Sequence, residues 1–114
     1  MIHLYGIPNC DKVRAARGWL EARAISHSFH DYRKDGADQQ RLRRWSAALG
    51  WEALINRRGT TFRKLAEANK GPLDADKAIL LMAEHPSLIR RPVVEYDGGL
   101  LIGFDETEWA QRLA

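Results

Sequence analysis

Cysteine is almost absent from this chain of 114 residues, which contains a single one, Cys10. One cysteine cannot form a disulfide within the chain or supply the cysteine pair of a metal site, and such scarcity is typical of a reducing compartment. Long apolar runs are also absent, because none approaches the roughly 18 residues that a membrane-spanning helix requires. The first residues, MIHLYGI, lack the basic and apolar regions of a secretory signal peptide. We therefore expect a cytoplasmic protein without membrane contact.

Repeats, linkers and low-complexity segments are missing as well. Hydrophobic residues make up 45% of the chain and charged residues 29%, which is the ordinary composition of a folded globular protein. A chain of this length can bury one compact core. We therefore expect a single structural domain over residues 1–114.

The excess of positive charge is small, with 18 Lys and Arg against 15 Asp and Glu. Arginine pairs at 43–44, 57–58 and 90–91 could contact nucleic-acid phosphates, but they are scattered and interleaved with acidic residues. A small-anion site built from a few arginines explains the same charge more economically, because the guanidinium fork matches carboxylates and oxyanions. Nucleic-acid binding is the minority interpretation, and we do not expect direct binding.

Strand and helix signals alternate at the start of the chain. The run IHLYGI (2–7) predicts a short buried strand, and residues 10–24 place apolar side chains at the three- and four-residue spacings of a helix. The segment SHSFHDYR (26–33) alternates in the manner of a second strand. A helix that connects two strands indicates a βαβ unit with parallel strands.

The remaining two-thirds of the chain change from helices to a hairpin. Residues 36–85 contain several amphipathic segments that indicate helices: one closes with Gly50, two are short, and the last begins with the acidic N-cap candidate Asp74 and ends at Pro86. Two apolar runs around Gly98-Gly99 predict a β-hairpin, and residues 105–114 predict a closing helix capped by Asp105. The expected fold is α/β and thioredoxin-like: a four-stranded mixed sheet, with a helical insert at approximately 36–88 between the βαβ and ββα halves.

Cys10 falls where the first predicted strand gives way to a helix. Free backbone N–H groups and the positive end of the helix dipole stabilise a thiolate at such a position. A buried structural cysteine is the commoner fate of a lone cysteine, but the turn-forming or polar neighbours Pro8, Asn9 and Asp11 favour a nucleophile. Asn9 either shapes the loop by a hydrogen bond or is a plain turn residue. The third residue after Cys10 is Val13, so an oxidised sulfur must be reduced by an outside thiol, for which glutathione is the usual cytoplasmic candidate.

Four segments of the chain carry a family resemblance: YGIPNCDKVRAARGWL, HDYRKDG, LINRRGTTFRKL and HPSLIRRPVV. In order and spacing they resemble the arsenate-reductase (ArsC) and Spx group of thioredoxin-like proteins, and most closely its YffB subgroup. The resemblance implies a glutathione-dependent thiol reductase with Cys10 as the catalytic residue, with glutathione as co-substrate and glutaredoxin as a candidate partner. The alternative is an Spx-like regulator that binds RNA polymerase, with Cys10 as a redox sensor or a relic. The missing second cysteine disfavours the redox-switch version.

The resemblance also implies which residues bind substrate. Arg91, in IRRP, is expected to face the cysteine loop and to hold an anionic substrate or a glutathione carboxylate, with Arg90 as a weaker candidate. One of Arg57 and Arg58, with Arg58 slightly favoured, is expected to add a second cation. The alternative for these arginines is a solvated surface role. Pro92 is expected to follow a cis bond and to pair with the main chain of a bound peptide or glutathione, although a trans proline is commoner.

Two features lower the expectation of arsenate or metal chemistry. Arsenate reductases resemble one another in an arginine just after the second hairpin strand, where this chain has Gly103 and Phe104. Losing that cation would cost about 2 kcal/mol or more of anion affinity, so arsenate is expected to be a poor substrate. The histidines show no ligand spacing and are expected in surface or core roles, so we expect neither a metal nor a bound cofactor. These histidines are His3, His27, His30 and His85.

Overall fold

The computed structural model describes residues 2–68 and 73–113. The chain divides into two compact units, which we name the sheet unit (Met1–Asp35 with Arg91–Ala114) and the helical unit (Gly36–Arg90). Within the described residues, no helix is both long and apolar enough to cross a membrane.

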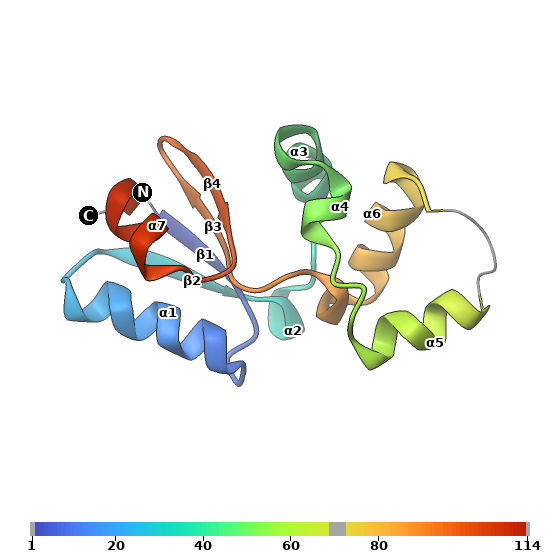
Figure 1. The fold of residues 1–114 in the computed structure, drawn as a ribbon, viewed down its shortest axis with the longest axis horizontal. Coiled ribbons are helices and arrows are strands. Elements are labelled where there is room, and N and C mark those ends of the chain that lie inside the picture. Colours follow the sequence, from blue (N-terminus) through green and yellow to red (C-terminus); the bar gives the residue numbers. More distant parts are fainter. Residues whose placement is uncertain (1, 69–72, 114) are drawn as a thin grey trace. The chain divides into compact units, whose positions relative to one another are not determined.

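The sheet unit is built on a mixed sheet whose four described strands lie in the order β2-β1-β3-β4. β1 and β2 are parallel, and β3 runs antiparallel to both β1 and β4. This is the thioredoxin-like arrangement that the element order predicted, with a βαβ half and a ββα half (Figure 1). Its elements are β1 (Ile2–Gly6), α1 (Asp11–Ala22), β2 (His27–Asp31), α2 (Tyr32–Asp35), β3 (Val93–Tyr96), β4 (Gly99–Ile102) and α7 (Glu106–Leu113).

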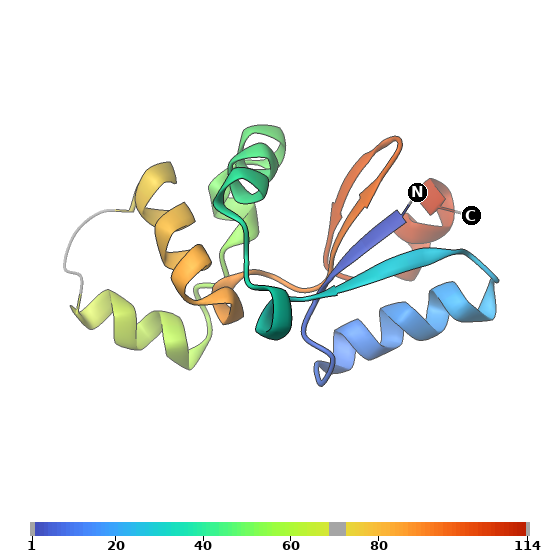
Figure 2. The same cartoon turned by 180° about the vertical axis from the view of Figure 1, so that it is seen from behind.

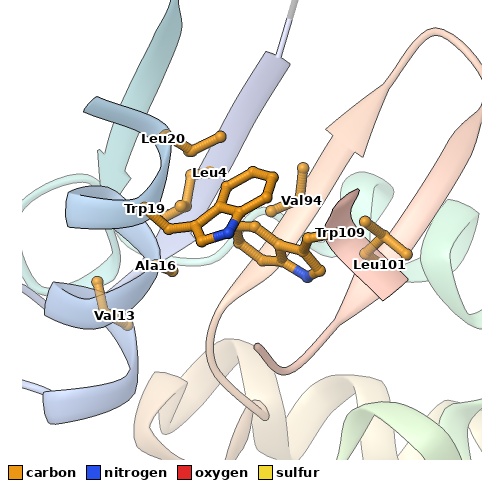
Figure 3. Close-up of a cluster of buried hydrophobic side chains, with 8 residues drawn as sticks. All are labelled: Leu4, Val13, Ala16, Trp19, Leu20, Val94, Leu101 and Trp109. Carbon is orange, nitrogen blue, oxygen red and sulfur yellow. The ribbon is translucent and has the colours of Figure 1, made fainter. Parts of the chain in front are cut away.

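One face of this sheet carries the apolar core of the unit. Leu4, Val94 and Leu101 lie side by side on β1, β3 and β4, because their positions correspond across the paired strands. Helices α1 and α7 cover this face with apolar side chains, and the rings of Trp19 and Trp109 meet edge to face at a centroid distance of 5.7 Å. The cluster consists of Leu4, Val13, Ala16, Trp19, Leu20, Val94, Leu101 and Trp109 (Figure 3).

The helical unit contains α3 (Gln39–Leu49), α4 (Trp51–Leu54), α5 (Thr60–Ala68), α6 (Ala75–Glu84) and the short 3-10 helix η1 (Pro86–Leu88). The carboxylates of Asp38 and Asp74 accept backbone N–H groups at the starts of α3 and α6. Gly50 ends α3 with a φ of +87°, a conformation that glycine adopts without steric cost. The acidic cap expected at the start of α6 and the glycine expected at the end of α3 are therefore confirmed.

Two element boundaries were predicted incorrectly. The second strand was expected over 26–33, but β2 ends at Asp31, and Tyr32 begins the short helix α2. The carboxylate of Asp31 accepts the backbone N–H of Arg33 at 2.9 Å, which gives the chain a local alternative to strand pairing. In the hairpin, Gly99 belongs to β4, where it pairs with Tyr96, so the turn is formed one residue earlier than expected.

Candidate functional site

Cys10 is the residue immediately before α1, in extended conformation with φ −92° and ψ 130°. Its backbone N–H donates to the carbonyl of Ile7 at 3.2 Å, which closes the exposed turn at Pro8 and Asn9. Its own carbonyl accepts the backbone N–H of Arg14 at 2.9 Å, so the first turn of α1 starts at Cys10. The thiol is half-buried and packs against the core cluster.

Several groups act on the charge of the Cys10 sulfur. Partial burial raises the pKa of the thiol, since it disfavours the charged form. This effect is outweighed by the backbone N–H of Val13, a hydrogen bond from the Arg91 side chain, the backbone N–H of Lys12 and the positive charge of Arg91, so the pKa of Cys10 is lowered. The sulfur makes no conventional N-cap hydrogen bond, but these N–H groups lie close enough to favour a thiolate. A thiolate with partial exposure can act as a nucleophile.

The sheet register explains why Arg91 reaches Cys10. Tyr5 on β1 pairs with Val93 on β3, and the two strands are antiparallel. The end of β1, which leads to Cys10, therefore lies beside the start of β3, which follows Arg91. The Arg91–Pro92 peptide bond is cis, as the resemblance implies. Residues that are far apart in the sequence thus meet where the two central strands, β1 and β3, end and begin.

Gly103 lies beside Pro92 in the same part of the site. Its backbone N–H donates to the carbonyl of Pro92 at 2.8 Å, and its carbonyl accepts the indole N–H of Trp109 at 3.2 Å. Gly103 has a φ of +78°, and a Cβ atom built there would meet no heavy atom within 4 Å. The following residue, Phe104, packs edge to face on Trp109 at 4.8 Å between ring centroids. This position therefore has open space where a side chain would be but no cation, and both of its backbone polar groups are already hydrogen-bonded.

The other predicted arginines lie in the helical unit. Arg57 and Arg58 are exposed in the loop between α4 and α5, and Arg90 is exposed at the end of the unit. The guanidinium of Arg57 lies over the ring of Trp51, with the carbon 5.0 Å from the ring centroid. The backbone N–H of Arg58 donates to the Asn56 side chain at 3.0 Å. Their roles in binding substrate stay predictions.

Sequence reasoning did not find two polar contacts on the sheet. The Tyr5 hydroxyl donates to Glu95 at 2.6 Å, and the rings of His3 and His30 make a nitrogen–nitrogen contact of 2.9 Å. The signal was present in the alternation of β1, where His3 and Tyr5 point to the face opposite Leu4. Within residues 2–68 and 73–113, no group of three or more His, Cys, Asp and Glu residues is arranged to hold a metal ion.

The arrangement of Cys10, Arg91 and Pro92 on this fold can be compared with known proteins. The model of the ArsC family matches residues 5–112. The chain belongs to the ArsC family. Its fold is that of the arsenate-reductase-like proteins, which supports thiol reductase chemistry at the level of the family.

The relatives of this ArsC-family protein include both an arsenate-reductase-related protein and a transcriptional regulator. The solved structure of the YFFB (PA3664) protein is 49% identical, covers 100% of both chains and superposes with a TM-score of 0.95. An arsenate reductase (ArsC) related protein from Brucella melitensis is 45% identical, with a TM-score of 0.76 and coverage of 97% of this chain and 92% of that one. Global transcriptional regulator Spx 1 from Lactococcus lactis is 33% identical over 110 residues, covering 95% of this chain and 85% of the relative.

Proposed function

We propose that this ArsC-family protein is a glutathione-dependent thiol reductase with Cys10 as its nucleophile. The observation that carries the proposal is the contact between Arg91 and the Cys10 sulfur at the start of α1, which lowers the pKa of the thiol. A structural cysteine needs no cation beside it, whereas a nucleophilic thiolate is stabilised by one. The proposed compartment is the cytoplasm, where glutathione is the usual small thiol.

The proposed reaction is a pair of thiol–disulfide exchanges. The Cys10 thiolate attacks the glutathionyl sulfur of a mixed disulfide between glutathione and a substrate thiol, the Cys10–glutathionyl S–S bond forms, the original S–S bond breaks, and the substrate sulfur leaves as a thiolate. A free glutathione thiolate then attacks the glutathionyl sulfur on Cys10, which releases glutathione disulfide and restores the Cys10 thiolate. The substrate mixed disulfide gains two electrons, and the two electrons come from the oxidation of glutathione to its disulfide. Because the chain has one cysteine, the second thiol must come from outside.

The other predicted residues take supporting parts in this proposal. Arg91 holds a glutathione carboxylate as well as the thiolate, and Arg58 or Arg57 supplies a further cation. The main chain at Pro92 pairs with the glutathione backbone, and Asn9 shapes the turn that presents Cys10. Glutathione is a co-substrate, and glutaredoxin is a candidate partner that accepts the glutathionyl group.

Adduct formation with glutathione disulfide tests the proposal. We expect the wild-type protein to gain one glutathionyl group per chain in intact mass spectra and Cys10→Ser to gain none. Arg91→Ala should form the adduct roughly tenfold more slowly, because a charge-assisted contact contributes about 1.5–3 kcal/mol. Arg90→Ala is the matched control, since this exposed neighbour is not among the groups that lower the pKa of the Cys10 thiol, and its rate should equal that of the wild type. A covalent dimer as the main product would contradict a glutathione site.

The Spx-type relatives support a second function, transcriptional regulation through RNA polymerase. In this alternative Cys10 is a redox sensor or a relic, and exposed residues of the chain make the contact. Co-elution of the purified protein with RNA polymerase would favour the regulator. Adduct turnover by glutathione without co-elution would favour the reductase.

A further inference from the structure

The sheet face opposite the apolar core carries a cluster of titratable side chains away from Cys10. His3 and Tyr5 come from β1, His30 from β2 and Glu95 from β3. His3 Nδ1 lies 2.9 Å from His30 Nε2, and the His30 ring stacks on Tyr5 with 4.5 Å between centroids and 17° between planes. The Tyr5 hydroxyl donates to Glu95 Oε1 at 2.6 Å. We name these four residues the polar face cluster.

The contact between the two histidines constrains their protons. A hydrogen bond between two imidazoles needs one N–H and one free lone pair. Either His30 Nε2 donates to His3 Nδ1, or His3 Nδ1 donates to His30 Nε2. When the rings are neutral, both are therefore Nε2–H tautomers or both are Nδ1–H tautomers. The pair can take up one further proton and keep the bond, but two imidazolium rings have no acceptor between them and repel each other.

The contact joins an edge strand to the rest of the sheet. β2 lies at one end of the strand order, beside β1 (Figure 2). All five of its residues are half-buried. His30 is on β2 and His3 is on β1, so their bond links the two strands through side chains in addition to the backbone ladder. Losing the bond therefore weakens the attachment of β2.

We propose that the His3–His30 hydrogen bond stabilises the attachment of β2 to β1 and that this stabilisation is lost when both rings are protonated. Among the described residues of the sheet unit, the titratable groups that face the pair are Tyr5 on β1, Glu95 opposite His3 on β3, and Tyr32 on α2, whose ring lies 6.4 Å from that of Tyr5. Glu95 is the carboxylate of this set, and one carboxylate can balance one added proton but not two. When β2 separates from β1, both rings can take up a proton without this repulsion, so acidification makes β2 open more readily.

Amide hydrogen exchange of the full chain tests whether the attachment of β2 depends on protonation of this pair. The amide protection of β2 is compared with that of the central strand β3 at about pH 7.5 and about pH 5. EDTA is present, and the exchange rates are corrected for intrinsic exchange. In the wild type, protection of β2 relative to β3 should fall roughly tenfold on acidification. In His30→Gln, relative protection should already be low at the higher pH and should change less than twofold. His27→Gln is the matched control on the opposite face of β2, where the ring contacts the Ile25 carbonyl, and it should keep the tenfold fall.

Two results would overturn the proposal. One is a wild-type β2 whose protection follows that of β3 at both pH values, and the other is an equal acid loss in His30→Gln. If that variant does not fold, the ring nitrogen resonances of the wild type decide the question. Matching tautomers of His3 and His30 above about pH 8 with coupled titration support the pair, whereas different tautomers with independent titration exclude it.

Discussion

The reactivity of Cys10 has two physical sources that mutation can separate. The backbone N–H groups of Lys12 and Val13 belong to the start of α1, and substitution of their side chains leaves these groups in place. Arg91 contributes through its side chain, by a hydrogen bond and by its charge. Changing Arg91 therefore removes one source while the helix start keeps the other.

The pH dependence of alkylation measures both sources. We expect the iodoacetamide rate of the wild type to rise at a lower pH than that of free cysteine, whose pKa is about 8.5. Arg91→Ala should raise the pKa of Cys10 and slow alkylation several-fold at neutral pH, and Arg91→Lys should fall between because it keeps the charge without the guanidinium fork. The thiolate contributes to folding stability above the pH at which the unfolded thiol ionises, and this contribution disappears as the pH falls through the folded pKa. A wild-type midpoint at or above that of free cysteine would exclude a stabilised thiolate.

Residue contacts could be predicted from the sequence where their determinants are local. The position of Cys10 follows from adjacent strand, turn and helix signals, and Asp105 caps α7 by accepting the backbone N–H of Glu108 at 3.1 Å. The contacts of Tyr5 with Glu95 and of His3 with His30 depend on strand order and register. A shift of one residue in either pairing would send these side chains to the other face, so alternation alone could not pair them.

At the level of elements, β1 and α1 approach closely just before and after the Cys10 turn. A Cβ atom on Gly6 would lie 2.7 Å from Cγ2 of Val13, a fully buried residue of α1. Glycine is therefore required at the end of β1 by packing. This close approach fixes where α1 begins relative to the sheet and hence where Cys10 stands.

Two glycine substitutions test this packing. Gly6→Ala should lower the free energy of unfolding by about 1–3 kcal/mol, the usual cost of overpacking, because Val13 has little room to move. Gly18→Ala is the matched control: Gly18 lies exposed in α1 with no heavy atom within 4 Å of an added Cβ. Alanine there should raise the free energy of unfolding by roughly 0.5–1 kcal/mol through helix propensity. Both values come from urea denaturation, and equal stability of Gly6→Ala and the wild type would contradict the close approach.

Element order was easier to predict than element ends. The order βαβ, helices, ββα follows from periodicity and from Gly, Pro and Asp signals, and it proved correct. The end of β2 was wrong because HDYR continues the alternation of a strand while Asp31 offers its carboxylate to the backbone of Arg33. That competition is decided by a single hydrogen bond, which composition does not reveal.

For the whole molecule, the charge is divided unevenly between the units. The helical unit has 10 Lys and Arg against 6 Asp and Glu, and the sheet unit has 8 against 9. The net positive charge of the chain therefore comes from the helical unit, whereas Cys10 belongs to a nearly neutral one. Within the sheet unit, anion binding near Cys10 depends on Arg91 as an individual group rather than on a broad positive field.

Arsenate turnover tests whether this limited set of cations is sufficient to bind arsenate. An arsenate carries its charge on several oxygens, and each must find a donor when the anion leaves water. Arg91 can supply one fork, but where the reductases have an arginine this chain has Gly103, which has no side chain and whose backbone N–H and carbonyl are already hydrogen-bonded within the protein. We expect arsenite formation that is slow or absent with saturating glutathione and glutaredoxin, measured beside brisk adduct formation with glutathione disulfide by the same preparation. That paired measurement separates a poor substrate from an inactive protein, and rapid arsenite formation would show that another group replaces the missing cation.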